Sequence, residues 1–230
     1  MNQRKPLAND STSSGLNLLA LSATTATTAI ALTLLAACGS LFAPDPPAPH
    51  FYTLDATALA GPARHVAAAP ASMAASAPVM IVAVPRAEAG FDTDRIVYVL
   101  EEHRLQPYAD NQWIDTPSKM LSPLISDAMA RTGSFGAVLM APSTVIGQWE
   151  LQSDIVRLQH EVVAARFRFT LHVTLIETRT RAVVLTREFD ASAPVDGASP
   201  AAAVAAANVV VADVLQQVAA ACASEVARRR

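Results

Sequence analysis

The sequence has little of what several protein classes depend on. Its 230 residues include two cysteines, too few for a disulfide-rich scaffold or a cysteine-based zinc ribbon. Eight glycines leave little material for a loop that wraps a phosphate group. The net charge of −3 argues against a nucleic-acid-binding protein, which needs a basic face. Charged residues make up only 16% of the chain and hydrophobic residues 52%, which favours one globular domain with tails over a disordered chain.

Motifs of known catalytic chemistry are also missing. The chain has no G-x-S-x-G, H-E-x-x-H, C-x-x-C or G-x-G-x-x-G motif and no Walker A loop. The five histidines stand apart, and in the pairs Glu102–His103 and His160–Glu161 adjacent residues of a strand would point to opposite faces. We therefore expect exposed histidines, no metal site, no cofactor and no catalytic residue. A triad assembled from distant parts of the chain is left open.

The first forty residues have the pattern of an export signal. Arg4 and Lys5 precede a mostly apolar stretch over residues 16–37. The stretch ends with Leu, two Ala and a Cys, and this ending resembles the lipobox of bacterial lipoproteins. The resemblance implies cleavage between Ala37 and Cys38 and lipid attachment at Cys38. The alternatives are an ordinary signal cleaved after Ala-x-Ala, and an uncleaved membrane-spanning helix with an incidental cysteine.

Composition divides the rest of the chain. We predict a signal peptide over 1–37, a lipidated Cys and proline-rich stalk over 38–50, and one periplasmic domain over 51–226 that contains an Ala/Pro-rich loop at 56–78. Gly39 follows the cysteine where Asp would favour the inner membrane, so by analogy with lipoproteins the outer membrane, periplasmic face, is favoured. Cys222 lies in an apolar helical pattern and is predicted to be a buried, unreactive side chain.

Hydrophobic periodicity indicates the fold class. Apolar residues alternate with polar ones in two long segments and recur at helical spacing in two others, one of which begins after Thr116 and contains Pro123. That helix either kinks at Pro123 or begins later, with Ser122 as its cap. The order of elements predicts an α/β or α+β domain with a mixed sheet packed by helices. The expected strands are 51–55, 79–84, 95–100, 105–113, 149–155, 166–175 and 183–189, and the expected helices begin at Pro117 and Pro200.

Charged residues at two places have competing interpretations. Asp92, Asp94 and Arg95 stand before a strand, where they could form an ion pair that fixes its entrance or could contact a partner. Arg166 and Arg168 lie on the polar face of a long strand, where they are solvated or line an interface. The sequence leaves both alternatives open.

Several segments in a fixed order resemble the ABC-type transport auxiliary lipoproteins, the PqiC-like family. They are the lipobox, Tyr-Thr-Leu at 52–54, Asp-Arg-Ile-Val-Tyr at 94–98, Tyr-Ala-Asp-Asn-Gln-Trp at 108–113 and the C-terminal Ala/Val helix. The resemblance covers about residues 51–225. It implies a three-layer fold similar to the N-terminal domain of TolB. It also implies a non-catalytic accessory of a permease, an ATPase and a periplasmic MCE-domain protein, which together move phospholipids between membranes.

The resemblance also suggests a partner surface. We expect Asp94, Arg95, Tyr98, Tyr108 and Trp113 to contact the MCE-domain protein, because aromatic and charged residues mix in this segment as they do at interfaces. The alternative is that the three aromatic residues only pack in the core or at a sheet edge. Two other functions stay open, a lipoprotein of a different envelope-assembly or export machine and a lipid-anchored hydrolase. A ring-like homo-oligomer would suit a tubular partner, but no residue demonstrates self-association.

Overall fold

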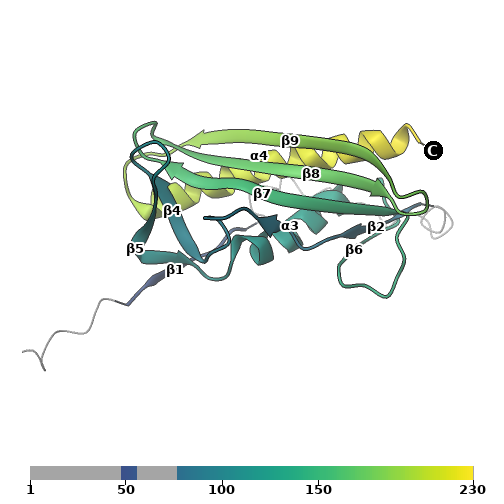
Figure 1. Ribbon diagram of the computed structural model, residues 1–230, viewed down its shortest axis with the longest axis horizontal. Coiled ribbons are helices and arrows are strands. Elements are labelled where there is room, and N and C mark those ends of the chain that lie inside the picture. The colour runs from purple at the N-terminus through teal and green to yellow at the C-terminus, as the bar shows by residue number, and fades with distance from the viewer. Residues whose placement is uncertain (1–47, 56–76, 230) are drawn as a thin grey trace, which may run out of the picture. The chain divides into compact units, whose positions relative to one another are not determined.

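The computed structural model describes residues 48–55 and 77–229, and these belong to one compact unit of the chain. The predicted signal peptide, Cys38 and most of the 56–78 loop lie outside the described residues. Within them, the elements run in the order β1 (His50–Tyr52), β2 (Val79–Val82), β3 (Arg86–Ala87), β4 (Arg95–Val99), β5 (Leu105–Trp113), α3 (Pro117–Arg131), β6 (Ala137–Met140), β7 (Trp149–Glu161), β8 (Arg166–Glu177), β9 (Ala182–Pro194) and α4 (Pro200–Ala227) (Figure 1).

Strand β7 organises the sheet because it pairs along both of its edges. On one edge it pairs with antiparallel β8, which pairs in turn with antiparallel β9. On the other edge three short strands pair with β7 in parallel, β2 near its start, β3 in its middle and β4 near its end. Strand β6 extends the sheet beyond β2, while β5 and then β1 extend it beyond β4. The predicted mixed sheet packed by helices is therefore confirmed.

The long strands form because apolar and polar residues alternate along them. In β8 the alternation holds, and Phe167, Phe169 and Leu171 are fully buried. In β7 it breaks, because a β-bulge between Ile155 and Arg157 adds one residue to the strand. Odd-numbered residues face the core before the bulge, and even-numbered residues face it afterwards.

Helix α3 begins where the sequence predicts. Thr116 is its N-cap residue, and Pro117 occupies the first turn, where its missing N–H costs no hydrogen bond. Pro123 lies inside the helix, which continues past it, so the alternative of a shorter helix capped by Ser122 is wrong. Gly133, with a φ of +65°, follows the last turn in a conformation that favours glycine.

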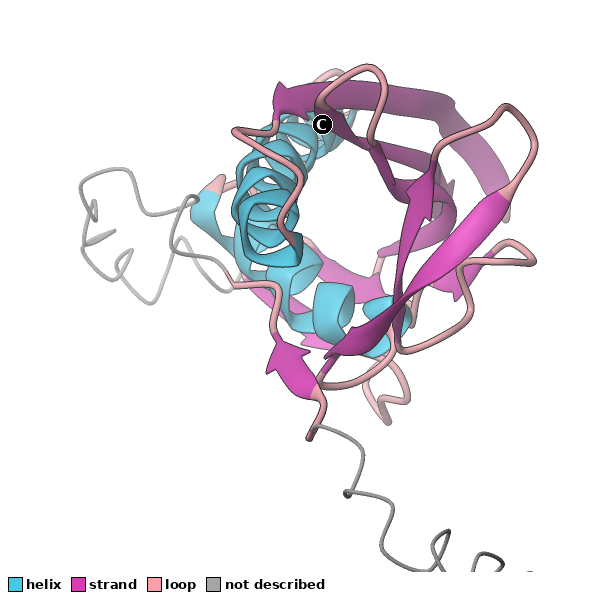
Figure 2. Cartoon of the chain, turned by 90° about the vertical axis from the view of Figure 1, so that its left-hand side faces the viewer, coloured by secondary structure: helices cyan, strands magenta, loops and turns pink. Residues whose placement is uncertain are grey.

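Helix α4 covers β8 and β9 and also contacts α3. Ser199 caps it as predicted, because its Oγ accepts a hydrogen bond from the N–H of Ala202 at 3.1 Å. The helix is long and apolar enough to cross a membrane, with a mean hydropathy of 1.5, but 56% of that window is buried inside the domain. Both helices lie on the concave side of the curved sheet (Figure 2).

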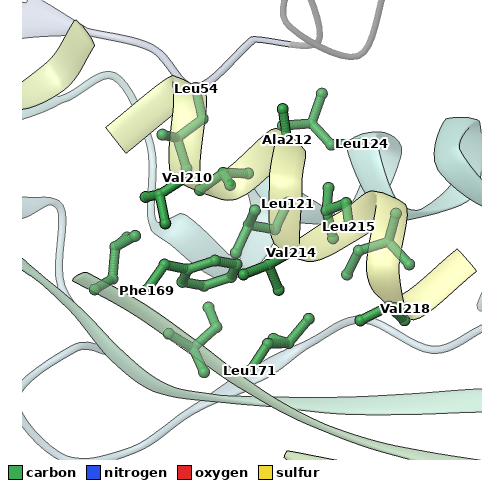
Figure 3. Close-up of a cluster of buried hydrophobic side chains, with 14 of the residues drawn as sticks. Leu54, Leu121, Leu124, Phe169, Leu171, Val210, Ala212, Val214, Leu215 and Val218 are labelled. Atoms are coloured by element: carbon green, nitrogen blue, oxygen red, sulfur yellow. The ribbon is translucent and has the colours of Figure 1, made fainter. Parts of the chain in front are cut away.

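The core forms where the two helices meet β8 (Figure 3). Leu121 from α3, Val214 and Leu215 from α4, and Phe169 from β8 are fully buried there. Removing each such side chain from water contributes about 1.5–3 kcal/mol to folding. These apolar residues were visible in the sequence as the helical and alternating patterns.

Two short strands were not predicted. Strand β3 has only two residues and carries no periodicity, and β6 is four residues long. Each pairs with a strand that was predicted, since β3 pairs with the long strand β7 and β6 pairs with β2, which also has four residues. Pairing with a neighbouring strand, and not a pattern of their own, therefore makes these segments strands.

Candidate functional site

The residues predicted to form a partner surface separate in the structure. Asp94 and Arg95 are exposed, and Arg95 pairs with Gln112 on the outer face, which we define as the face of the sheet opposite the helices. Tyr98 and Tyr108 are half-buried on the core side. Trp113 is 2% exposed and packs in the core. The expectation that Trp113 contacts a partner is wrong, because so buried a side chain presents no surface.

Tyr98 and Tyr108 belong to a small aromatic cluster with His160, on three neighbouring strands. The ring centroids of the two tyrosines lie 4.7 Å apart, with their planes inclined by 42°. The Tyr108 hydroxyl lies 2.6 Å from Nδ1 of His160. The Tyr98 hydroxyl donates a hydrogen bond to Oε1 of Gln106 at 3.0 Å. These contacts join β5, β4 and β7, so the packing alternative describes this pair of tyrosines better than a docking surface does.

His160 is 1% exposed, so the expectation that all five histidines are exposed is wrong for this residue. The bulge in β7 explains the difference, because it shifts the core-facing positions from odd to even numbers. The sequence holds a trace of this shift. The buried positions of β7 include Leu151 and Ile155 before the bulge and Leu158 after it.

Burial controls the ionisation of this cluster. It lowers the pKa of His160 and raises the pKa of Tyr108, with a smaller contribution to the latter from Tyr98. Both groups are therefore neutral at neutral pH. A neutral imidazole and a phenol can share one hydrogen bond in either direction, depending on the tautomer. The pair satisfies two buried polar groups and holds the strands together.

Exposed apolar residues lie on the outer face beside Arg95. Phe51 on β1 is 56% exposed and pairs with Gln112 of β5. Ile114, directly after β5, is 60% exposed, and its N–H donates to the carbonyl oxygen of Tyr52 at 2.7 Å. We call Phe51, Gln112, Ile114 and Arg95 the β1–β5–β4 surface. Its mixture of an aromatic, an aliphatic and an arginine side chain is typical of protein interfaces.

Two hollows on the outer face share Leu105, and the smaller of them reaches Arg95 of this surface. The smaller one, about 220 Å³, is lined by Arg95 and Pro107 among other residues. The larger one, about 510 Å³, lies between the β4–β5 turn and the β7–β8 turn, and Arg157 and Arg168 line it. The outer face is thus hollowed where β4 and β5 meet β7.

The strand arginines beside the larger hollow are held in ion pairs. Arg168 makes two hydrogen bonds with Asp190, from Nε to Oδ1 at 2.8 Å and from its terminal nitrogen to Oδ2 at 2.9 Å. Asp190 also accepts a hydrogen bond from the hydroxyl of Thr170, and the Arg168 guanidinium chiefly holds the pKa of Asp190 below its usual value. Arg166 binds Glu161 at 2.6 Å. Neither arginine points freely into solvent.

The charged residues before β4 are not paired with one another. Within residues 48–55 and 77–229, no ion pair joins Asp92 or Asp94 to Arg95, so of the two alternatives the ion pair at the strand entrance is wrong. Hydrogen bonds from main-chain N–H groups fix this entrance instead. The N–H of Trp113 donates to the carbonyl oxygen of Asp94 at 2.7 Å, and the N–H of Arg95 donates to Oγ1 of Thr93 at 3.2 Å.

Strand register brings together an acid, a histidine and a hydroxyl that are far apart in the sequence. On the outer face Nδ1 of His172 lies 3.7 Å from Oδ2 of Asp154, and its Nε2 lies 3.1 Å from Oγ1 of Thr186. The first distance is too long for a hydrogen bond. Asp154 instead accepts a hydrogen bond from Nε of Arg86 at 2.7 Å. The acid therefore does not orient the imidazole as in a catalytic triad.

Metal ligands do not gather in the described part of the chain, where no group of three or more His, Cys, Asp or Glu is arranged to hold an ion. Ala37 and Cys38, the predicted cleavage and lipid-attachment residues, lie outside the described residues. Cys222 is fully buried, as predicted, and burial raises the pKa of its thiol to about 12. It is a protonated packing residue rather than a reactive thiol.

Comparison with known proteins identifies the family. A family model described as "ABC-type transport auxiliary lipoprotein component" matches residues 52–219. The chain belongs to this family. The protein is therefore an auxiliary lipoprotein of ABC-type transport, and a place in the bacterial cell envelope follows. The match begins at Tyr52, after the predicted stalk, so the family relationship rests on the folded domain.

Solved structures share the fold. A protein from Xanthomonas campestris matches with a TM-score of 0.62 and 20% identity, over 66% of this chain and 87% of its own. An uncharacterised protein matches with a TM-score of 0.57 and 10% identity, over 78% of this chain and 99% of its own. No curated protein matches the sequence. At these identities the structural likeness concerns the fold alone.

Proposed function

We propose that this auxiliary lipoprotein is anchored by acyl chains on Cys38 at the periplasmic face of the outer membrane and receives an MCE-domain periplasmic protein there. That protein works with a permease and an ATPase to move phospholipids between the two membranes. Family membership supports the transport role. The lipobox and Gly39 support the anchor and its membrane. More than one acyl chain gives a stable attachment.

The proposed role is non-catalytic. The arrangement closest to a hydrolytic triad is Asp154, His172 and Thr186, and in it the carboxylate binds Arg86 instead of orienting the histidine. A docking role needs a surface and not a reactive group. This distinguishes the proposal from the alternative of a lipid-anchored hydrolase.

The observation that carries the docking proposal is the β1–β5–β4 surface. Phe51 and Ile114 each expose more than half of their area beside Arg95. Exposed apolar groups of this size next to a guanidinium are what a partner protein would cover. The surface also lies at β1, where the chain enters the domain from the predicted stalk. A partner reaching the outer membrane would therefore meet it near the anchor.

Site-specific photo-cross-linking in cells tests this proposal with the full-length protein. A photoreactive amino acid at position 114 should capture an MCE-domain protein, which mass spectrometry would identify. Val183 is a matched control, because it is 57% exposed but lies by the β8–β9 turn, at the other end of the long strands. Capture through position 183 and not 114 would overturn the proposal that the β1–β5–β4 surface is the docking site. Capture through position 114 of a protein from a different envelope-assembly or export machine would overturn the proposal that the partner is an MCE-domain protein.

A further inference from the structure

Two arginines lie on neighbouring strands of the outer face without a bonded partner. Arg95 on β4 and Arg157 on β7 each stand two residues before the pair Val97–Gln159 that sets these strands in register. In the described part of the chain, neither guanidinium makes a hydrogen bond or an ion pair. Like charges directly opposite each other on adjacent strands destabilise a sheet. An anion bound between them would relieve that repulsion.

Two acidic side chains beside the larger hollow are already engaged, while Glu102, which also lines it, contacts only His103 among the described residues, at 3.6 Å. Glu161 is held by Arg166 at 2.6 Å, and hydrogen bonds from Arg166 and Gln159 keep its pKa below the usual value although burial acts to raise it. Asp190 accepts two hydrogen bonds from Arg168. Arg157 reaches Asp190 only through a weak charge interaction. Arg157 in the larger hollow is therefore a cation that no carboxylate within residues 48–55 and 77–229 binds directly.

Apolar side chains surround these two arginines. Leu100, Leu105 and Val163 line the larger hollow and are 46%, 41% and 81% exposed. Leu105 also lines the smaller hollow beside Arg95. A ligand that contacts both arginines would thus cover apolar side chains at the same time. A simple inorganic anion would leave these apolar groups exposed to water.

We infer that the outer face of the β4–β5 hairpin binds an acidic segment of a partner protein, with carboxylates on Arg95 and Arg157 and an apolar side chain over Leu105. This inference rests on the proposed function, because it names the chemistry of the partner that docks beside the β1–β5–β4 surface. The guanidinium fork matches a carboxylate in two parallel hydrogen bonds. Since the whole chain carries a net charge of −3, these two cations mark one place where an acidic partner is attracted rather than repelled.

A defined peptide tests the inference without any knowledge of the natural partner. The full-length protein, purified in a neutral detergent, is titrated into a fluorescent peptide of alternating Glu and Leu, with a Gln and Leu peptide as its uncharged match. We expect the acidic peptide to bind more tightly and the difference to shrink with added salt. Arg95→Gln and Arg157→Gln should each weaken its binding roughly fivefold. Arg179→Gln is the control, because its side chain is 83% exposed at the far turn.

Three results would overturn the inference. The first is equal binding of both peptides, and the second is acidic-peptide binding that neither Arg95→Gln nor Arg157→Gln reduces. The third is a lipid ligand, shown by vesicles of phosphatidylglycerol that bind through the same arginines while the acidic peptide does not bind. Failure of the proposed function can be distinguished from failure of this inference. If position 114 captures no MCE-domain protein but the acidic peptide binds through both arginines, the proposed partner is wrong and the proposed binding site for an acidic segment stands.

Discussion

The Tyr108 hydroxyl and Nδ1 of His160 lie 2.6 Å apart, on strands that β4 separates. This contact links β5 to β7 across β4 on the core side of the sheet. It exists because the bulge in β7 turns His160 inward. A fully exposed histidine would contribute little to the fold, whereas a buried, neutral one couples the stability of the fold to pH.

We expect the free energy of unfolding to fall as the pH drops below about 6.5, the pKa of an unperturbed histidine. Burial lowers the pKa of His160 in the folded protein, so the unfolded chain takes up the proton first. The contribution of this residue is therefore complete above that pH and is lost as the pH falls toward the folded-state pKa. Urea unfolding followed from pH 8 to pH 5 measures it.

Two variants assign this pH dependence to one residue. His160→Asn should flatten the fall in unfolding free energy between pH 6.5 and pH 5. His50→Gln changes an exposed histidine on β1 and should leave the slope as in the original protein. Equal slopes in the original protein and His160→Asn would show that another group is responsible.

The sequence allowed the sheet and both helices to be predicted because their patterns are long. Residues 149–155 and 166–175 alternate in two strands, and residues 200–227 repeat apolar side chains at helical spacing. A bulge has no fixed sequence signature, and the single leucine at 158 is too short a trace to predict that His160 turns inward. The two-residue strand β3 has no pattern of its own, because only its pairing with β7 makes it a strand.

Trp113 and its neighbour Ile114 should have opposite roles. Trp113→Ala removes a side chain that is 2% exposed and should lower the free energy of unfolding by about 3–5 kcal/mol. Ile114→Ser changes a side chain that is 60% exposed and should shift stability by less than about 0.5 kcal/mol. Chemical denaturation measures both. A loss for Ile114→Ser as large as that for Trp113→Ala would show that Ile114 supports the core.

These adjacent residues also show why the partner surface was only partly predicted. A strand sends neighbouring side chains to opposite faces, and the face of each depends on register. The register of β5 against β4 shifts between Arg95 and Val97, so sequence spacing alone could not place Tyr108, Trp113 and Arg95 relative to one another. The types of residue in this segment suggested an interface. The pairing of the strands determines which of these side chains reach the outer face.

Cys222 should resist thiol reagents in the folded protein. It is fully buried, and burial raises the pKa of its thiol to about 12, so almost none of it is the reactive thiolate at pH 8. We expect iodoacetamide to label it slowly under native conditions and quickly in urea, as followed by the mass of the peptide that contains it. Rapid native labelling would mean that α4 leaves the sheet frequently.

Cys38→Ser should separate the anchor from the fold. If Cys38 carries the acyl chains, this change removes the thiol to which the lipid attaches, and the protein should leave the outer-membrane fraction or keep its uncleaved signal. The folded domain begins twelve residues later at His50, so its unfolding in urea should not change. Fractionation of cell membranes followed by mass spectrometry of the N-terminus measures the loss.

Cys222→Ser is the matched control, because a buried cysteine in α4 has no access to the acylating enzymes, and this variant should fractionate normally. Outer-membrane recovery of Cys38→Ser with a processed N-terminus would overturn the lipid anchor while leaving family membership, which rests on residues 52–219, untouched.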